Sequence, residues 1–430
     1  MQKAKFDYNK PCIVFIIITL GFFQNIITAQ QLAFSNAEGF GKYTSGGRYG
    51  SLYHVTNLND SGTGSLRDAV SKPNRIIVFD LGGVIKINTR LIINENITIA
   101  GQTAPGGGIT VYGNGIAFSG NGNNIIRYIR FRMGKSGDNK KDTVGLSNTK
   151  VNIIFDHVSM SWGKDGTFDA NGYNIDNITL QDCFIAQGIN IDNHSTGGLI
   201  QCSKISIIRS LWIDNKTRNP KIRGTHEFIN NVIYNWRTNG YIAGGTSGIS
   251  EVNMLGNYFV YGPESIQDSH ITRTTPSFNI YQKDNRIDTN KDGILNGEKL
   301  TNYYTATIQN TPYDYPGVNN LMSAKETVNF MVKNSGASIV RDEVDKLLIN
   351  ELLSFGTKGK IITTEDDNNI SDGVGFVAKG KIKKDSDNDG MPDDFEDLMG
   401  FDKELKDHNL DKDNNGLTNI ELYFEYLIIN

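Results

Sequence analysis

The sequence predicts an all-β protein built as a solenoid, in which short strands stack coil upon coil. Three observations lead to this prediction. From about residue 53 to residue 263, short β-rich runs alternate with glycine or asparagine. The later runs recur roughly every 21–28 residues, a period typical of solenoids. Within each run apolar and polar residues alternate, as strands with one buried face require. On pattern alone a β-sandwich is the alternative.

Seven runs carry the clearest strands, in chain order. They are "NITIAG", "NNIIRYIRFRMG", "VNIIFDHVSMSW", "DNITLQDCFIAQG", "ISIIRSLWIDN", "HEFINNVIYNW" and "EVNMLGNYFVYG". No helical period of comparable length separates them, which argues against alternating strands and helices. Stacked coils would bury each apolar face against the next, and asparagines at the turns can form ladders along the stack. Cys183 and Cys202 each lie in an apolar run, so a disulfide and two buried thiols are both open.

The first 29 residues have the pattern of a secretory signal peptide. Lysines precede the apolar run "CIVFIIITLGFF", and a cut after Ala29 fits the residues that follow. This run is too short for a membrane span, and no later run is long and apolar enough for one. We therefore expect a secreted protein that is extracellular, periplasmic or held at the cell surface, and monomeric. A net charge of −4 over 430 residues argues against nucleic acid as a partner.

The character of the chain changes after residue 263. The runs at 323–336 and 340–356 carry apolar residues at helical spacing, so we expect two helices packed against the solenoid. The solenoid domain with these helices would span residues 30–355. Residues 356–384 are polar and rich in glycine and lysine, which is typical of a linker.

Residues 385–430 carry a calcium-loop pattern. The run "DSDNDGMPDDFE" places acids at loop positions 1, 3, 5, 9 and 12, a glycine at position 6 and a backbone carbonyl at position 7. Carboxylates this dense repel one another unless a cation neutralises them. The run therefore predicts a structural Ca²⁺ site in an EF-hand-like segment, with the candidate ligands Asp385, Asp387, Asp389, Met391, Asp393 and Glu396.

Two further runs resemble this loop less closely. In "DKDNNGLTNIEL" the candidate ligands are Asp411, Asp413, Asn415 and Asn419, but position 12 is a leucine and Glu421 stands one place early. This is a possible second loop. The run "DTNKDGILNGEK" begins similarly at residue 288 but ends on a lysine, and an Asx-rich turn explains it equally well.

A cationic run and three acids point to a site on the solenoid. "TRNPKIRG", residues 217–224, gathers Arg218, Lys221 and Arg223 around a proline in a chain of negative net charge. Residues about one coil apart stack within several ångströms in a parallel solenoid. Acids that precede and follow the run "VNIIFDH" could therefore converge on one face: Asp142, Asp165 and Asp169. Three converging carboxylates suit Ca²⁺, a hard ion that prefers oxygen.

These motifs resemble the pectate lyase family of right-handed parallel β-helices. The resemblance rests on "GSLYHVTNLNDSGTGSLRDAVS", "ITIAGQTAPGG", "IIFDHVSMSW" with "DGTFD", and "RNPKIR", and it covers about residues 34–263. It implies that the three acids match the calcium-binding acids of the family. It also implies that Arg218 matches the catalytic base and that Arg223 matches the substrate-binding arginine.

The resemblance further implies cleavage of (1→4)-α-D-galacturonan by β-elimination. In that reaction the C5 proton is removed, the 4-O-glycosidic oxygen leaves, and an unsaturated sugar remains. Ca²⁺ on the uronate carboxylate and nearby cations would stabilise the charge that develops, and a cationic patch would bind the acidic polysaccharide. Arginine is in general a poor base, because its pKa exceeds about 12. Arg218 is therefore expected as the base or as a stabiliser of charge.

Two other functions fit the same fold. A pectin lyase would cleave methyl-esterified polymer without Ca²⁺, but a neutral ester needs no calcium bridge, and the acid trio argues against it. A non-catalytic solenoid would only bind polysaccharide, and the pair Arg218 and Arg223 argues against that. The C-terminal loops would bind Ca²⁺ structurally or tether the enzyme, so deletion of residues 385–430 should leave intrinsic turnover largely intact.

The chain departs from the family pattern at one position. Many relatives carry a lysine just before the apolar run that precedes the arginines, whereas this chain has "NHSTGGLI". Lys221 or another cation would take over its contact with the sugar carboxylate, or binding would be weaker. His194 could border the substrate. His157 is expected to be structural, and Trp162 could stack on a sugar or belong to the core.

Overall fold

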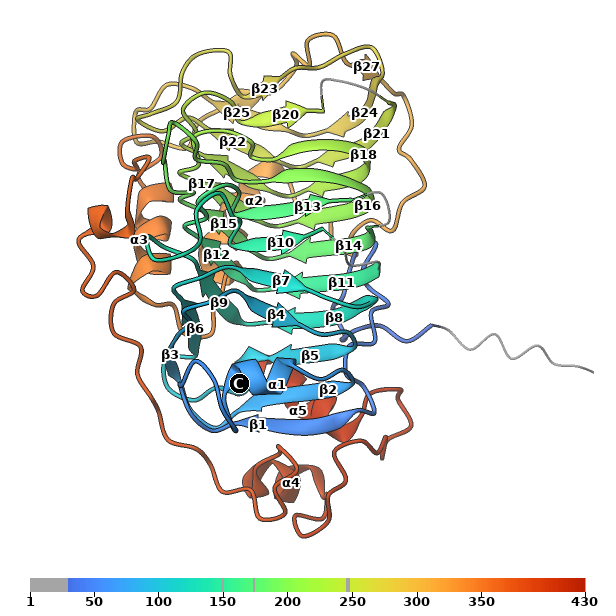
Figure 1. Cartoon of the computed structure of the whole chain (residues 1–430). Helices are drawn as coiled ribbons and strands as arrows, with labels where there is room; N and C mark the ends of the chain where they lie inside the picture. Colours follow the sequence, from blue (N-terminus) through green and yellow to red (C-terminus); the bar gives the residue numbers. More distant parts are fainter. Residues whose placement is uncertain (1–29, 148–150, 173–174, 245–247, 430) are drawn as a thin grey trace, which may run out of the picture. The chain divides into compact units, whose positions relative to one another are not determined.

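The computed structural model describes residues 30–147, 151–172, 175–244 and 248–429. The predicted signal peptide, residues 1–29, lies outside the described residues. Residues 31–430 form one compact unit, and this unit is a parallel β-solenoid with a few helices on its outside (Figure 1). The predicted fold class is confirmed. Among the helices of the described residues, none has the length and apolar character needed to cross a membrane.

Within the described residues the strands form two sheets. The larger sheet has seventeen strands: β1 (Ser51–Val55), β2 (Arg75–Phe79), β4 (Leu91–Ile93), β5 (Ile97–Ala100), β7 (Ile116–Phe118), β8 (Gly122–Arg127), β10 (Val144–Leu146), β11 (Val151–Asp156), β13 (Phe168–Asn171), β14 (Asp176–Gln181), β16 (Leu199–Ile208), β18 (Lys221–Ile229), β20 (Tyr241–Ala243), β21 (Ser250–Leu255), β23 (Ile271–Thr272), β24 (Phe278–Lys283) and β27 (Thr307–Ile308). The smaller sheet has ten: β3 (Gly83–Lys86), β6 (Ile109–Tyr112), β9 (Ile129–Arg132), β12 (Ser159–Ser161), β15 (Phe184–Ala186), β17 (Leu211–Ile213), β19 (Val232–Tyr234), β22 (Tyr258–Val260), β25 (Arg286–Asp288) and β26 (Glu298–Lys299).

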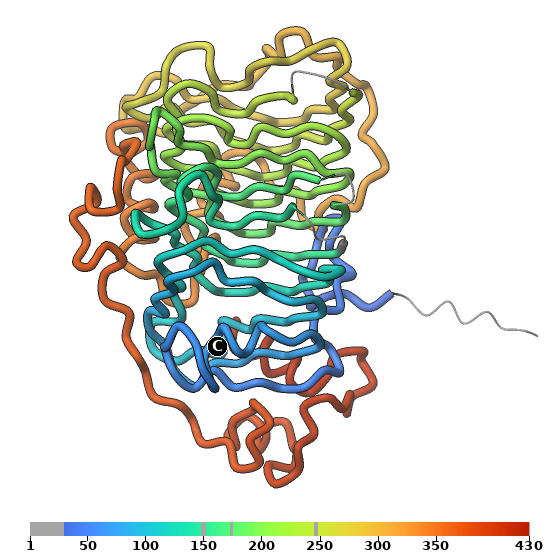
Figure 2. Tube along the Cα trace, viewed as in Figure 1, coloured from blue at the N-terminus to red at the C-terminus, as the bar shows by residue number. Residues whose placement is uncertain are grey.

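Successive coils pair in parallel, and their register stacks like residues in the core. Ile99 pairs with Ile126, which pairs with Phe155, and the column continues through Leu180 to Ile207. Each of these five side chains is fully buried. Figure 2 shows the coils lying one on another along the chain. The repeating apolar runs form a solenoid because each coil buries its inner side chains only against its neighbours.

An asparagine ladder runs along one corner of the stack, as the sequence predicts. The side-chain amide of Asn231 donates to Asn257 Oδ1 at 3.1 Å, and that of Asn257 donates to Asn285 Oδ1 at 2.8 Å. All three side chains are fully buried. Each also satisfies a backbone carbonyl of the neighbouring coil, as Asn257 does for Phe228 at 2.7 Å. Buried polar groups therefore find partners within the ladder.

The two predicted helices are present and cover the smaller sheet. α2 (Ala324–Asn334) begins with a capping box between Ser323 and Glu326. α3 (Glu343–Leu352) follows it. The apolar side chains of both helices pack in one cluster with the outward residues of β15, β17, β19 and β22. Arg132 of β9 donates to Asp342 and Asp345 at 2.9 and 3.0 Å, and this buried pair of contacts ties α3 to the sheet.

Three smaller elements complete the solenoid. α1 (Leu66–Val70) packs its apolar side chains into the main core next to the first coils, and η1 (Gly101–Thr103) follows β5. Trp162 is fully buried and donates to Gln187 at 3.0 Å, so it belongs to the core. Cys183 and Cys202 are both buried free thiols. Burial raises the pKa of Cys202 to about 12 and that of Cys183 well above its usual value.

The segment expected as a linker, residues 356–384, contacts the solenoid. Ile362 is buried, and Glu365 in η2 (Glu365–Asn368) accepts hydrogen bonds from the Tyr112 hydroxyl at 2.5 Å and the Lys135 N–H at 2.9 Å. The domain boundaries themselves stay predictions.

The C-terminal cap, residues 385–429, packs on the first coils. It holds α4 (Asp393–Met399) and α5 (Asn419–Ile429), drawn in red beside β1 and β2 in Figure 1. Apolar side chains of the cap bury the outer face of β2 and β5. Two ion pairs add to this contact: Arg48 with Glu421 at 2.7 Å and Arg127 with Glu425 at 3.0 Å.

Candidate functional site

The predicted acids and cations lie on successive coils joined by backbone hydrogen bonds. The N–H of Thr143 donates to Gly166 at 3.0 Å, that of Thr167 to Gly197 at 3.1 Å, and that of Gly197 to Thr217 at 3.0 Å. The loops that carry the site therefore follow one another as levels of a single stack. Neighbouring levels are about 4.8 Å apart.

Asp169 points away from the core because of strand alternation. It stands in β13 between the buried Phe168 and Ala170. Its Oδ1 accepts a hydrogen bond from the Leu199 N–H of the next coil at 2.8 Å. The strand pattern thus places this carboxylate on the outer face of the larger sheet, where it can meet a ligand.

Asp142 lies close to Asp169 around Gly166. Asp142 Oδ1 accepts a hydrogen bond from the Gly166 N–H at 2.9 Å. A Cβ atom at Gly166 would lie 2.2 Å from Asp169 Oδ1 and 3.0 Å from Asp142 Oδ1. Both carboxylates therefore crowd the same small space, and a side chain at residue 166 would fill it.

The charges in this space are incompletely compensated. Burial, followed by the charge of Asp142 and then Asp165, raises the pKa of Asp169 well above its usual value, while Arg218 opposes the shift. Burial and the neighbouring Asp165 also raise the pKa of Asp142, against the hydrogen bond from Gly166 and the charges of Arg90 and Lys141. Acids that repel each other in this way gain stability when a cation binds between them.

Asp165 faces a different neighbour. His194 Nε2 lies 2.7 Å from Asp165 Oδ1, and both side chains are about two-fifths exposed. Both residues therefore border the acid group, on adjacent coils joined by a bridge between Gly166 and Thr196. The charge of Asp165 acts on both other acids. Within the described residues, however, the three acids are not among the groups whose ligand atoms all lie within 4.8 Å of one another.

The predicted cations stand two levels from Asp169 along the stack. Leu199, whose N–H binds Asp169, pairs with Lys221 of β18. Lys221 and Arg223 flank the buried Ile222, so both point to the outer face, as Asp169 does. Arg218 has a left-handed φ of 58°, which is uncommon for a residue with a side chain. The acids and the cations therefore share one face.

A fourth cation joins this group, and sequence reasoning missed it. Burial, followed by the charges of Arg218, Arg273 and Arg223, lowers the pKa of Lys221. Arg273 follows β23, which pairs with β20, and β20 pairs with β18. Only the coil register relates residue 273 to residue 221, so the spacing in the chain gave no signal.

These four cations form a cationic group without anionic partners. In the described part of the chain, none of the side chains of Arg218, Lys221, Arg223 and Arg273 makes a hydrogen bond or ion pair. Three of them are half-buried and Arg273 is exposed. Cations held close together without carboxylates favour an anionic ligand.

The level that lacks the family lysine carries small buried side chains. Ser195 and Thr196 are fully buried there, and the Ser195 hydroxyl donates to the carbonyl of Gly188. Lys216 lies nearby but donates to the carbonyl and side chain of Asn193. The cation closest in register to the absent lysine is therefore Lys221, one coil further on.

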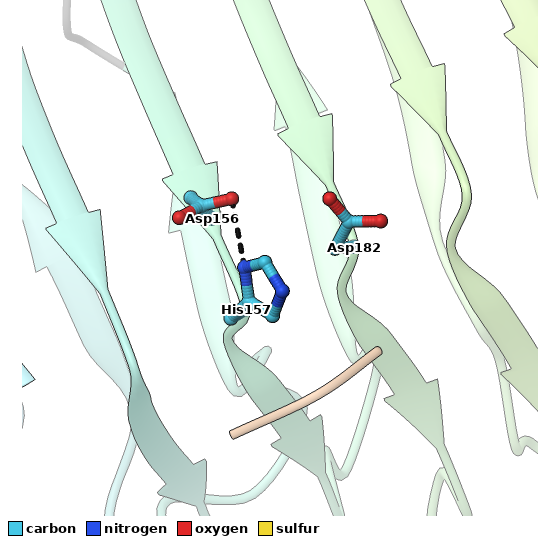
Figure 3. A group of neighbouring side chains, drawn as sticks. All are labelled: Asp156, His157 and Asp182. Atoms are coloured by element: carbon cyan, nitrogen blue, oxygen red, sulfur yellow. Dashed lines mark hydrogen bonds and ion pairs between the residues drawn. The ribbon is translucent and has the colours of Figure 1, made fainter. Parts of the chain in front are cut away.

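A second acid and histidine group lies at another corner of the solenoid. Asp156, His157 and Asp182 have ligand atoms within 4.8 Å of one another (Figure 3). Both carboxylates already have cationic partners: Arg127 contacts Asp156 at 2.8 Å and Arg209 contacts Asp182 at 2.8 Å. His157 also stacks on Tyr128 with ring centroids 4.5 Å apart. This group is thus a structural ion network, in agreement with the structural role expected for His157.

The first C-terminal loop has the backbone of a calcium loop. Asp385 accepts hydrogen bonds from the N–H groups of Asp389 at 3.2 Å and Gly390 at 2.9 Å, and Asp389 accepts one from Met391 at 3.0 Å. Gly390 has φ +88°, the sharp turn expected at position 6. Asp385, Asp387 and Asp389 have oxygens within 4.8 Å of one another.

The remaining predicted ligands of this loop divide into two sets. Asp393 accepts from the Ser386 N–H at 2.7 Å and pairs with Lys384 at 2.8 Å, on the outside of the loop. Glu396 instead turns inward and meets Asp389 and Asp407, again within 4.8 Å. Burial, followed by the charge of Asp389, raises the pKa of Glu396 to about 8. Sequence reasoning missed Asp407, because it lies beyond the twelve-residue pattern.

The second loop repeats the backbone but not the acid group. Asp411 accepts from the N–H groups of Asn415 at 3.1 Å and Gly416 at 2.9 Å. Asn419 contacts the Lys412 N–H at 3.3 Å, whereas Glu421 pairs with Arg48. At the start of the third run, Asn290 and Asp292 accept from backbone N–H groups two residues on, as in an Asx-rich turn.

Comparison with known proteins bears on this arrangement. No family model matches the chain. The chain is 48% identical to the probable pectate lyase C of Aspergillus flavus over 407 residues, which cover 93% of this chain and 95% of that protein. It is 48% identical to the protein of the same name from Neosartorya fischeri over 419 residues, which cover 96% and 97%. It is 28% identical to pectate lyase 2 of Ambrosia artemisiifolia over 265 residues, which cover 55% and 65%.

Solved structures share the fold. A pectate lyase bound to a hexasaccharide matches with a TM-score of 0.53 at 14% identity, covering 73% of this chain and 100% of that chain. A polygalacturonate lyase matches with a TM-score of 0.54 at 14% identity, covering 72% and 99%. Nearly half of the residues of the chain are also identical to those of two relatives along almost their full length. The chain therefore belongs to the pectate lyase family of polysaccharide lyases.

Proposed function

We propose that this protein is a secreted, Ca²⁺-dependent pectate lyase that cleaves (1→4)-α-D-galacturonan by β-elimination. One observation carries the proposal: the carboxylates of Asp142 and Asp169 crowd the space around Gly166, on the face of the sheet that also carries four cations without anionic partners. Galacturonan is a polyanion, so its carboxylates supply the charges that the cationic group lacks.

The donor set around Gly166 fits Ca²⁺. Asp142, Asp165 and Asp169 offer oxygen ligands only. Burial, followed by the charge of Asp142, raises the pKa of Asp169. These three residues would hold the ion. When bound, it would neutralise the carboxylate of the uronate and make the C5 proton easier to remove.

The cations of the chain would bind and orient the sugar. Lys221 and Arg223 project from the same strand face two residues apart, so they can contact carboxylates of one or adjacent sugars. Arg218 stands at the start of this group, and its charge already acts on Asp169. This position suits a residue at the reacting sugar.

Arg218 would act at C5 in one of two ways. It would accept the C5 proton itself, or its guanidinium would stabilise the developing negative charge while water or hydroxide accepts the proton. In both cases the C5–H electron pair forms the C4–C5 double bond and the 4-O-glycosidic bond breaks. The oxygen of the leaving sugar then takes up a proton.

Incubation with polygalacturonate tests the proposal. The new conjugated double bond absorbs ultraviolet light, so absorbance should rise with Ca²⁺ present and stop rising when a chelator removes it. Absorbance that persists without calcium on methyl-esterified pectin would instead indicate a pectin lyase. Tight binding of the polymer with no absorbance change under any condition would indicate a binding protein.

The variant Arg218→Ala tests the assignment of the reacting residue. We expect kcat to fall by about 100-fold or more, because a proton-transfer or charge-stabilising group is lost. Arg286→Ala is a matched control, since Arg286 lies on β25 of the smaller sheet. Full turnover in Arg218→Ala would remove Arg218 from the reaction.

A further inference from the structure

We propose that Asp389, Glu396 and Asp407 bind a Ca²⁺ ion that fastens the C-terminal cap onto the first coils of the solenoid. This site is separate from the acids around Gly166. It shares Asp389 and Glu396 with the twelve-residue loop and adds Asp407 from outside that loop, while Asp393 of the loop faces Lys384 instead.

The three carboxylates converge in a buried space. Their oxygens lie within 4.8 Å of one another. Asp389 and Glu396 are completely buried, and Asp407 is 6% exposed. Both carboxylate oxygens of Glu396 and Oδ1 of Asp407 are buried without a hydrogen-bond partner. Carboxylates that converge in this way, with orphaned oxygens, are expected to coordinate a cation.

The protein itself supplies little positive charge here. Within the described residues no lysine or arginine comes within ion-pair distance of the three acids, and the nearest basic atom is His408 Nδ1, 4.0 Å from Asp389 Oδ2. Asp385 and Asp387 add two further carboxylates beside Asp389. Burial of so much like charge is costly unless a cation enters.

The chemistry of the donors favours Ca²⁺. All the converging groups are carboxylates, and Ca²⁺ accepts six to eight oxygens in flexible geometry. Mg²⁺ prefers a small octahedron that keeps several waters, which a buried group of converging carboxylates leaves little room for. The backbone of the loop, with Gly390 at its turn, also matches that of calcium loops.

The position of the site explains what the ion would do. Glu396 belongs to α4, and the N–H of Asp407, in the segment before α5, donates to Asp389 Oδ2 at 3.2 Å. An ion on all three would therefore join the loop, α4 and the approach to α5. These parts carry the apolar side chains that cover Ile76, Val78 and Ala100.

The second loop provides an internal comparison. It has the same backbone hydrogen bonds, but Asn415 stands where the first loop has Asp389. Its Asp411 is half-buried and its Asp413 is exposed. In the described residues its acids are not among the groups whose ligand atoms all lie within 4.8 Å of one another, so the proposal places one ion in the cap, at the first loop.

Calcium titration of the full-length protein tests the proposal. After chelation, adding CaCl₂ should raise the melting temperature of the wild type. Asp407→Asn should bind the ion at this site more than about tenfold more weakly and lose most of this shift. Without calcium the same variant should melt at the wild-type temperature or above it, because a buried negative charge has gone. The variant should thus melt below the wild type with calcium and at or above it without calcium. A residue with only a structural role is not expected to give this reversal.

Controls separate this ion from the one proposed at the acid trio. Asp397→Asn removes an exposed carboxylate from α4 that pairs with Lys403, and it should keep the wild-type calcium response. Asp169→Asn should keep the calcium-dependent protection of the cap even if activity is lost. The proposal fails if Asp407→Asn and the wild type show the same calcium-dependent shift.

Limited proteolysis of the wild type gives a second readout that needs no variant. Phe376 and Ile382, before the cap, are 81% and 52% exposed. Calcium should slow cleavage within residues 385–429 at least severalfold, because a fastened cap opens less often. If the variant Asp407→Asn of the calcium titration does not fold, the variant Glu396→Gln is used in that titration instead. Cleavage in the cap at the same rate with and without calcium would overturn the proposal.

Discussion

Lys221 stands one coil away from the place where many pectate lyases carry a lysine. Its pairing with Leu199 aligns it with Asp169 across two levels of the stack, about 10 Å apart. A sugar carboxylate between the two levels could reach both the acids' ion and this amine. The chain thus keeps a cation on this face although the run "NHSTGGLI" has none.

We predict that Lys221→Met raises KM about tenfold or more while kcat changes much less. The substitution keeps the aliphatic stem and removes only the charge, so it should weaken binding of a uronate carboxylate. Steady-state kinetics on polygalacturonate measure both constants. Lys204→Met, at an exposed position of the same sheet, is the control. An unchanged KM for Lys221→Met would show that another cation makes this contact.

His226 makes the protein sensitive to acid. Burial lowers its pKa to about 4, against an ordinary value of 6.5 in the unfolded chain. Between these values the unfolded chain binds a proton that the folded chain does not, so stability falls as pH falls. The stabilising contribution is fully present above about pH 6.5 and decreases by up to about 1.4 kcal/mol per pH unit below it.

We therefore predict that His226→Asn flattens the pH dependence of stability between pH 6.5 and pH 4. Urea unfolding at several pH values, at one fixed calcium concentration, gives the free energy of unfolding for both proteins. The variant loses the contact with the Tyr241 hydroxyl, so its stability at pH 7 should be lower. Parallel curves for the two proteins would contradict the prediction.

At the scale of single residues, chain order reveals only part of the site. Arg218, Lys221 and Arg223 form a local motif, and the sequence alone identifies them. Arg273 and Asp407 could not be found in this way, because their neighbours are set by coil register and by the path of a loop. Such contacts depend on tertiary packing that no short pattern encodes.

The asparagine ladder is an element whose stability can be measured directly. Asn257 accepts from the Asn231 N–H at 2.8 Å and donates to both Phe228 and Asn285. We predict that Asn257→Ala lowers the free energy of unfolding by about 3 kcal/mol, because buried backbone groups lose their partners. Denaturant unfolding checks this, and Asn121→Ala, at an exposed position, should change little. A small loss in Asn257→Ala would mean that water replaces the side chain.

Strands and helices were predictable where local pattern and burial agree. The β-rich runs carry buried apolar residues at alternate positions, although strands such as β9 and β15 are buried on both sides. Helix α2 carries both its amphipathic pattern and its capping box in sequence. Residues 356–384 were interpreted as a linker from their polarity. A few side chains such as Ile362 and Glu365 contact the solenoid there, and these few contacts leave little trace in composition.

At the scale of the whole molecule, the cap and the candidate active site lie at different levels of the stack. The cap covers β2 and β5, whereas the acids and cations lie from β10 to β23. The sequence predicted a separate C-terminal segment, but it did not reveal the apolar face that this segment covers. That face belongs to β-runs whose outward positions are apolar as well as their inward ones.

Deletion of residues 385–430 should therefore separate stability from catalysis. We predict a lower melting temperature, because each apolar side chain of β2 and β5 that becomes exposed lowers the free energy of unfolding by roughly 1.5–3 kcal/mol at most. Turnover per folded molecule should stay close to that of the full chain. Circular dichroism and the absorbance assay measure the two quantities. A truncated protein that is fully folded but inactive would show that the cap contributes to the reaction.

Because the site is built on successive coils, the spacing between its charged groups follows the spacing between the coils. Each charged side chain of the site belongs to one coil. Moving a charge to the equivalent position of the next coil therefore shifts it by about 4.8 Å along the stack. The core column from Ile99 to Ile207 is fully buried, so a substitution on the outer face leaves its packing unchanged. A solenoid of this kind can therefore change the positions at which it binds the charges of a polymer while its buried core stays the same.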